Sequence, residues 1–164
     1  MKTSSNIRIS QACAADAVPI AELSRDLIET GLGWRWRASR VLAMVREPEC
    51  VVLTAHLGDT LLAFAIMEFK STHAHLNLLA TAPAYQRQGY ARRLLDWLVA
   101  SARIAGLDRI TVEVRADNTK ARAYYANLGF TFKRRLKGYY AGREDALQLV
   151  HLLMNPEIAA GRPC

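Results

Sequence analysis

The chain has 164 residues, of which 51% are apolar and 23% are charged. At roughly 100–200 residues per domain this length predicts a single domain, and the composition is typical of a globular protein rather than a disordered chain. The 22 Lys and Arg against 15 Asp and Glu leave a formal net charge of +7, which favours an anionic partner. The longest uninterrupted apolar run, Leu61–Met67, is far shorter than the roughly 20 residues of a membrane-spanning helix.

The cysteines argue against a disulfide framework and against a zinc cluster. Cys13, Cys50 and Cys164 are odd in number, widely scattered and never arranged as a CxxC pair. His73 and His75 share one face of an expected strand, but two histidines without a third ligand make a poor metal site. No metal is therefore expected. Because no signal-peptide core follows the N-terminus, the sequence also predicts a cytoplasmic protein that contacts no membrane.

The first half of the chain is expected to form one strand, two helices and three further strands. Asp16 and Pro19 indicate the start of the first helix, because Asp caps helix N-termini and Pro is tolerated in the first turn. Gly58-Asp59 indicates a tight turn between two strands. The expected strands are Ile7–Ser10, Cys50–Leu57, Leu61–Phe69 and Ala74–Ala80, and the expected helices run from Asp16 to before Gly31 and from Ser39 to Arg46.

The second half alternates helices and strands. Six apolar residues between Ala91 and Ala102 recur at helical spacing, and Gly106 ends that helix. Asn118 is expected to cap one more helix, which stops at Gly129. The expected strands are Ile110–Arg115, Thr131–Leu136 and Ala146–Leu153. This order predicts an α/β (α+β) domain over residues 1–155, with a mixed sheet covered by helices on both faces, and a flexible C-terminal tail over residues 156–164.

The stretch Gln86–Ala91, between an expected strand and the strongest helix, is the most informative segment. The first turn of a helix offers unpaired backbone N–H groups and a partial positive charge, which together attract phosphate. Gly89 permits close approach to that turn, and Arg87 and Arg92 flank it. The alternative is a surface turn with solvated arginines. Neither a P-loop nor a GxGxxG fingerprint occurs in the chain.

A longer pattern surrounds this turn. Pro83 precedes it, and Glu113–Asn118 is followed by Ala121, Tyr125 and Gly129-Phe130. With these residues, the stretch from Leu79 to Leu153 resembles the acetyl-coenzyme A half of the GNAT superfamily of N-acetyltransferases. It is most similar to the ribosomal-protein N-terminal alanine acetyltransferases. Those enzymes share a tyrosine pair like Tyr139-Tyr140 and a run like Gly142–Ala146. The resemblance implies the single-domain GNAT fold, a mixed, mostly antiparallel twisted sheet of about seven strands with four helices on both faces.

The resemblance also implies acetyl-coenzyme A (acetyl-CoA) as cosubstrate, with no metal. Backbone groups of Leu79, Ala80 and Thr81, at a splayed strand end, are then expected to hold the pantetheine arm and to face the thioester carbonyl. Asn118 is expected to bond the pantetheine or phosphate region while it caps its helix. The residues expected at the phosphates are Arg87, Gln88, Gly89, Tyr90, Ala91 and Arg92.

Two further residues are expected to carry out the acetyl transfer. Glu113 lies on the polar side of its strand and is expected to act as the base that deprotonates the acceptor ammonium, provided that burial or a water raises its competence. Its alternative is a solvated glutamate or a salt bridge to Arg115. Tyr125 is expected to donate a proton to the departing sulfur, and its alternative is a core aromatic residue. The chemistry is expected to be direct transfer without an acyl-enzyme.

The acceptor is expected to be the N-terminal α-amine of a protein or peptide. By resemblance, Tyr139 and Tyr140 occupy the connection between the last two strands and line the acceptor groove, and Trp34 is a candidate lid. A small-molecule amine is the first alternative, which Trp34 and Trp36 closing the cleft would favour. A nucleic-acid-binding module is a remote alternative, because the arginines are dispersed along the chain and no RNA- or DNA-binding motif occurs. The chain is expected to be a monomer or a homodimer.

Overall fold

A computed structural model describes residues 6–153 of the chain. These residues group into two compact units that interleave along the sequence. The first unit takes the chain up to Glu68 together with Leu76–Trp97, and the second takes Phe69–His75 and the chain from Leu98 onward. The predicted tail, residues 156–164, lies outside the described residues, and the single-domain boundary at residue 155 stays a prediction.

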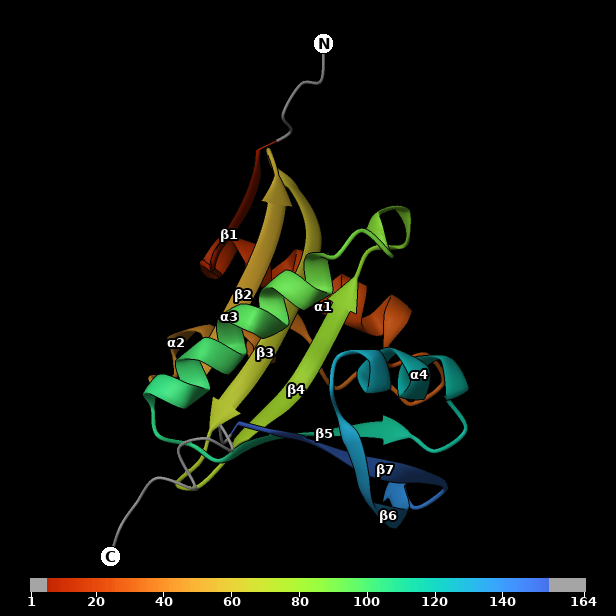
Figure 1. Ribbon diagram of the computed structural model, residues 1–164. Helices are drawn as coiled ribbons and strands as arrows, with labels where there is room; N and C mark the ends of the chain where they lie inside the picture. Colours follow the sequence, from red (N-terminus) through yellow and green to blue (C-terminus); the bar gives the residue numbers. More distant parts are fainter. Residues whose placement is uncertain (1–5, 154–164) are drawn as a thin grey trace, which may run out of the picture. The chain divides into compact units, whose positions relative to one another are not determined.

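The seven strands follow the order β1-β2-β3-β4-β5-β7-β6 in one sheet (Figure 1). β4 pairs with β5 in parallel, whereas β1–β2, β2–β3, β5–β7 and β6–β7 pair antiparallel. The predicted mixed sheet of seven strands with four helices is therefore confirmed. The strands are β1 (Ile7–Gln11), β2 (Cys50–Leu57), β3 (Thr60–Phe69), β4 (Ala74–Thr81), β5 (Arg109–Arg115), β6 (Thr131–Tyr140) and β7 (Glu144–Leu152).

In the first unit, helices cover both faces of the strands. α1 (Ala17–Leu27) and α2 (Ala38–Arg46) pack on one face, where Ile20, Val41 and Phe64 belong to one buried cluster. The start of α3 (Tyr90–Ile104) lies on the opposite face (Figure 1). Residues Leu62–Met67 of β3 are all buried, because a strand covered on both faces has no solvent side. This explains why β3 contains the longest apolar run of the chain.

In the second unit, α4 (Thr119–Asn127) follows β5 and is capped as predicted. The side-chain oxygen of Asn118 accepts a hydrogen bond from the backbone N–H of Ala121 at 3.0 Å. Tyr125 and Phe130 are buried and meet edge to face, with ring centroids 5.3 Å apart. The helix is therefore held at its N-terminus by a cap and toward its C-terminus by an aromatic contact.

One expected boundary is wrong. β6 runs to Tyr140, so Tyr139 and Tyr140 lie in the strand and not in the connection after it. Pairing with β7 extends the strand, because Tyr140 is opposite Glu144 across a turn that includes Ala141 in the left-handed region (φ 54°). A register shift between Leu136 and Tyr140 interrupts the ladder, which hides the extension from a simple alternation pattern.

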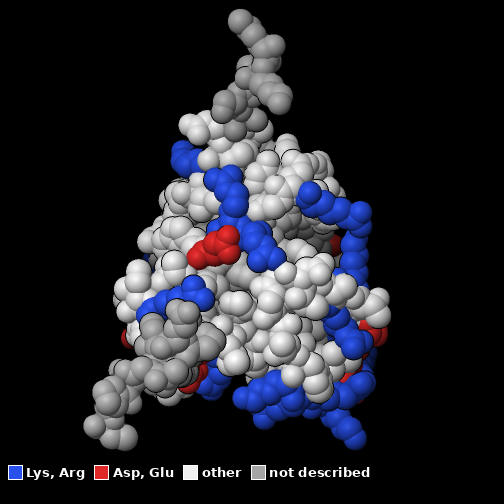
Figure 2. Space-filling model, in the orientation of Figure 1, with Lys and Arg blue, Asp and Glu red and all other residues white. Residues whose placement is uncertain are grey.

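The surface carries the positive charge unevenly. Figure 2 shows basic side chains gathered over the end of the second unit where β6 and β7 run. On β6 the exposed basic residues are Lys133, Arg134, Arg135 and Lys137. Among the described residues, no helix is long and apolar enough to cross a membrane.

Candidate active site

The predicted phosphate turn lies in the first unit, immediately before α3. Gly89 has φ +84°, and apart from its neighbours in the chain nothing lies within 4 Å of where a Cβ would be. Arg87 is a non-glycine residue in the left-handed region (φ 61°), which is uncommon and is found preferentially at functional turns. The backbone of the turn therefore borders open space at the N-terminus of a 15-residue helix. An anion site requires this arrangement, because a ligand must reach the backbone N–H groups.

Side-chain hydrogen bonds hold this turn in shape. Gln86 Nε2 donates to the carbonyl oxygen of Thr81 at 3.0 Å, and Gln88 Nε2 donates to that of Ala84 at 3.3 Å. The side chains of Arg87 and Arg92 are exposed, Tyr90 is half-buried and Ala91 is buried. The two glutamines thus act mainly on the loop itself, and the arginines are the side chains that can reach an anion.

The end of β4 leads into this turn. Leu79 and Ala80 are buried and Thr81 is half-buried. The N–H of Ala82 donates to the carbonyl oxygen of Leu62 on β3 at 2.8 Å, which ties the end of β4 to its neighbour. The predicted pantetheine strand and the predicted phosphate turn are therefore joined in one unit by the Gln86–Thr81 hydrogen bond.

Glu113 lies in the second unit, and both of its carboxylate oxygens have partners. His75 Nε2 is 2.9 Å from Oε2, and Gln148 Nε2 donates to Oε1 at 3.2 Å. Burial alone would raise the pKa of Glu113, but the hydrogen bonds and charge of His75, the hydrogen bond of Gln148 and the charge of Arg134 outweigh it and lower the pKa. The increase in basicity expected from burial is therefore not found. Arg115 pairs with Glu144 instead, with Nε 3.9 Å from Oε2.

Tyr125 lies on the buried side of α4. Burial raises the pKa of its phenol, so that the hydroxyl keeps its proton throughout the physiological range. Tyr125 thus packs as a core aromatic residue and is also in the protonation state that a proton donor needs. The neighbouring Tyr124 is exposed.

The paired tyrosines differ in environment. Tyr139 is exposed and Tyr140 is half-buried, and their rings meet at right angles with centroids 4.9 Å apart. Burial raises the pKa of Tyr140. Asp145 accepts from the N–H of Gly138 at 2.9 Å and from Nε of Arg135 at 2.7 Å, which fixes the strand just before the pair.

The loop after α1 contains a polar centre that the sequence analysis missed. Glu29, only 8% exposed, accepts hydrogen bonds from Ser24 Oγ at 3.0 Å and from the N–H groups of Arg35 and Trp36 at 2.7 and 3.0 Å. Nothing in the local pattern distinguishes it from the solvated glutamates of the chain.

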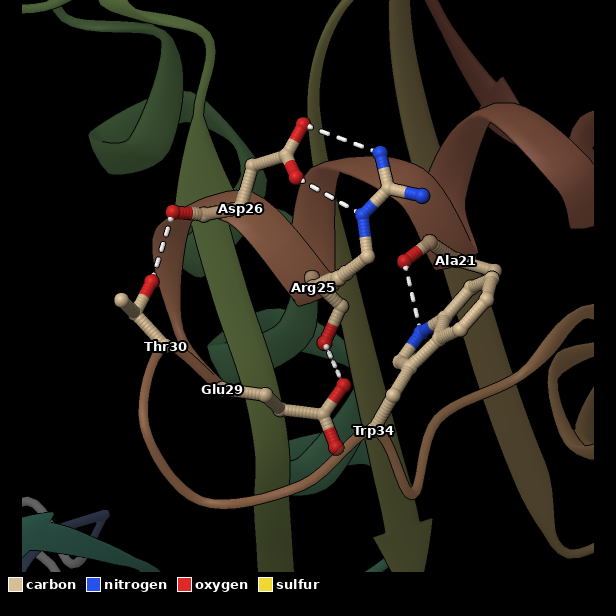
Figure 3. Close-up of polar contacts among 7 residues, drawn as sticks. Ala21, Arg25, Asp26, Glu29, Thr30 and Trp34 are labelled. Atoms are coloured by element: carbon tan, nitrogen blue, oxygen red, sulfur yellow. Dashed lines mark hydrogen bonds and ion pairs between the residues drawn. The ribbon is translucent and has the colours of Figure 1, made fainter.

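Trp34 lies in the same loop and is held against α1. Its Nε1 donates to the carbonyl oxygen of Ala21 at 3.1 Å, as Figure 3 shows together with the Arg25–Asp26 pair of α1. The guanidinium groups of Arg25 and Arg37 lie 5.2 and 4.9 Å from the centroid of its ring. Trp36 is buried. Both indoles are therefore engaged within the first unit.

The predicted residues thus fall into two groups. The first unit brings together Leu79–Thr81 and Arg87–Arg92 and also contains Trp34, whereas the second contains Glu113, Tyr125 and Asn118 together with the paired tyrosines. His75 and Gln148, the partners of Glu113, were not predicted. Their signal was the place of a single polar residue among buried apolar neighbours, His75 at the alternating start of β4 and Gln148 within β7. In the described part of the chain, no three His, Cys, Asp or Glu side chains are grouped as a metal site.

Known proteins are similar to this chain in sequence. A sequence model described as "Acetyltransferase (GNAT) family" matches residues 18–130. The ribosomal protein bS18-alanine N-acetyltransferase of Escherichia coli K12 is 41% identical over 88 residues, which are 52% of this chain and 60% of that protein. The chain therefore spans less than two thirds of the curated relatives it matches.

Solved structures show the same fold. The ribosomal-protein-S18-alanine N-acetyltransferase from Escherichia coli superposes with a TM-score of 0.76 at 28% identity, covering 93% of this chain and 97% of that one. The paia N-acetyltransferase from Thermoplasma acidophilum, solved in complex with coenzyme A, has a TM-score of 0.75 at 15% identity, covering 90% and 99%.

Proposed function

Since the chain belongs to the acetyltransferase (GNAT) family, we propose that it is an acetyl-CoA-dependent N-acetyltransferase that acts on the N-terminal α-amine of a protein or peptide. The observation that carries the proposal is the turn before α3. There a left-handed glycine facing open space and exposed arginines stand at a helix N-terminus. These residues fit the phosphates of coenzyme A, because backbone N–H groups and a helix dipole both favour anions.

In this proposal the first unit binds the cosubstrate. The phosphates are held by backbone N–H groups of Gly89–Arg92 and by the side chain of Arg87, while backbone groups of Leu79–Thr81 hold the pantetheine arm. Acetyl-CoA supplies an acetyl group activated as a thioester. A single well-aimed backbone N–H contributes about 2.7–4 kcal/mol when charge develops on an acyl oxygen. Asn118 holds the start of α4 and is also a candidate contact to the cosubstrate.

The second unit supplies the proton transfers. Glu113 is the proposed acceptor of the proton from the substrate ammonium, since only the neutral amine is nucleophilic. Its lowered pKa makes it a weak acceptor, so the transfer runs through a water that the carboxylate orients. Tyr125 is the proposed donor to the departing sulfur: its raised pKa keeps the hydroxyl protonated, although it also makes the phenol a weaker acid.

A peptide acceptor is favoured over a small-molecule amine. Trp34 and Trp36 closing the cleft would favour the small-amine alternative, yet Trp34 is tied to Ala21 and flanked by arginines and Trp36 is buried. The exposed Tyr139 and the half-buried Tyr140 are the proposed lining of a peptide groove. A cytoplasmic location and a monomeric or homodimeric state stay predictions.

The test has two parts. Calorimetric titration with acetyl-CoA should show micromolar binding, and mass spectrometry should detect acetylated products from a panel of N-terminal peptides but not from small amines. Tyr125→Phe should lower kcat without changing cosubstrate affinity, whereas Tyr124→Phe, its exposed neighbour, should behave as the wild type. No binding heat at millimolar acetyl-CoA would refute the proposal. Acetylation of small amines alone would refute the peptide acceptor.

A further inference from the structure

A row of polar side chains, all of residues in the second unit, crosses four strands on the face that carries Glu113. In the sheet register His75 of β4 lies opposite Thr111 of β5, and Glu113 of β5 lies opposite Gln148 of β7. Gln148 in turn lies opposite Arg134 of β6. Side chains opposite or diagonal to one another on one sheet face are within contact distance. Four strands therefore bring their polar positions to one carboxylate.

The hydrogen bonds along this row have only one consistent direction. Arg134 Nε donates to Gln148 Oε1 at 3.0 Å, which leaves the amide NH₂ of Gln148 to donate to Glu113. The charge of the arginine thereby fixes which end of the glutamine meets the carboxylate. One oxygen of Glu113 is held in this way, and His75 holds the other.

His75 is itself held by a hydroxyl. Its Nδ1 lies 2.9 Å from Thr111 Oγ1, and its Nε2 lies 2.9 Å from Glu113 Oε2. Because a hydroxyl both donates and accepts, the neutral ring can accept from Thr111 while donating to Glu113, and the charged ring can donate to both. The imidazole thus donates to the carboxylate in either protonation state without moving.

We infer that His75 is a positioning residue for the acetyl transfer proposed above, acting through Glu113. It keeps the carboxylate ionised and in one orientation, so that a water between Glu113 and the substrate ammonium meets a fixed acceptor. The inference rests on the proposed function, because it assigns Glu113 the role of proton acceptor. His75 is half-buried beside a largely buried carboxylate, with side chains 22% and 11% exposed. Its loss would leave a carboxylate oxygen with little access to water.

Other charged and titratable groups of the unit also interact electrostatically with this pair. His73, which precedes β4, interacts with His75 and with Arg109 of β5, and Arg134 and Tyr140 of β6 interact with Glu113. The hydrogen bond to Oε2 of Glu113 comes from His75 and not from any of these four residues.

The first measurement follows Glu113 directly. The ¹³C chemical shift of its carboxylate, titrated by NMR, should report a higher pKa in His75→Leu than in the wild type, because the buried carboxylate then has one hydrogen-bond donor fewer. His75→Gln retains an N–H donor and should give an intermediate value. His73→Leu is the matched control and should leave the value unchanged. An unchanged pKa in His75→Leu, with the fold verified by the same spectra, would overturn the inference.

The second measurement is kinetic. His75→Leu should lower kcat for peptide acetylation about tenfold to a hundredfold with little change in KM, and His75→Gln should restore part of the loss. In Glu113→Gln, the further change His75→Leu should have no added effect, since the histidine acts through the carboxylate. Additive losses would overturn the inference. If the wild type acetylates no acceptor, the proposed function fails, while the NMR titration still reports whether His75 controls Glu113.

Discussion

Replacing Glu29 by alanine is the sharpest test of how the first unit is held together. The carboxylate accepts three hydrogen bonds in a site that is only 8% exposed, and two of these come from the backbone of the loop that carries Trp34. Glu29→Ala leaves those donors without their acceptor. The N–H of Arg35 belongs to an exposed residue and can turn to water, whereas the N–H of Trp36 belongs to a buried one.

The expected loss follows from this difference. A buried donor left unpaired costs about 1–3 kcal/mol, and hydrogen bonds to a charged acceptor are worth about 1.5–3 kcal/mol each before water replaces them. Since water reaches only part of the site, Glu29→Ala should lower the free energy of unfolding by about 2–4 kcal/mol. Glu29→Gln keeps one oxygen as the acceptor for both N–H groups and offers its NH₂ to Ser24 Oγ, so its loss should be about 1 kcal/mol.

Equilibrium urea unfolding followed by tryptophan fluorescence and far-UV circular dichroism measures both losses, and coincidence of the two probes checks two-state behaviour. Asp26→Asn is the control, because the Arg25–Asp26 pair lies at the surface and its loss should not shift the urea midpoint. A loss below about 1 kcal/mol for Glu29→Ala, or equal losses for the alanine and glutamine variants, would refute the reasoning.

Three further predictions concern single residues. Because the pKa of Glu113 is lowered, its ionised carboxylate stabilises the folded state at pH values above the ordinary glutamate pKa of 4.5. This contribution disappears as the pH falls from 4.5 through the folded-state pKa. Glu113→Gln should therefore flatten the acid side of a stability–pH curve measured by urea unfolding, and an unchanged slope would contradict it. Asn118→Ala should lower stability by about 1 kcal/mol while Asn118→Asp retains the cap, as urea midpoints will show; equal losses would rule out the cap. Gly89→Ala and Gly106→Ala place alanine at φ +84° and +77° in open space and should each cost about 1–2 kcal/mol, but calorimetry should find weaker acetyl-CoA binding only for Gly89→Ala.

Local patterns predicted the parts of the fold that local interactions determine. The apolar period from Ala91 to Ala102 marks α3 because one helix face packs on the sheet, and Asn118 marks the start of α4 because a cap acts within three residues. The turn at Gly89 could be predicted for the same reason, since its conformation depends on residues next to it in the chain.

Pairings between distant segments could not be predicted in this way. Tyr139 and Tyr140 look like loop residues because β6 is largely polar, and only its pairing with β7 makes them part of a strand. The environment of Glu113 depends on His75 and Gln148, which lie 38 and 35 positions away and meet it only through the sheet register. The direction of its pKa shift therefore needed the structure.

The position of β6 in the sheet gives part of the excess positive charge a second role, which is to keep copies of the chain apart. Within residues 6–153, β6 is the last strand in the sheet order and pairs with β7, so its other side is an edge of the described sheet. Lys133, Arg134, Arg135 and Lys137 are exposed along it. Two copies of the chain that approached edge to edge would bring these like charges together, which discourages aggregation through the open strand. Because this repulsion is screened over about 8 Å at physiological ionic strength, the protection is strongest in dilute salt and weakens as salt is added.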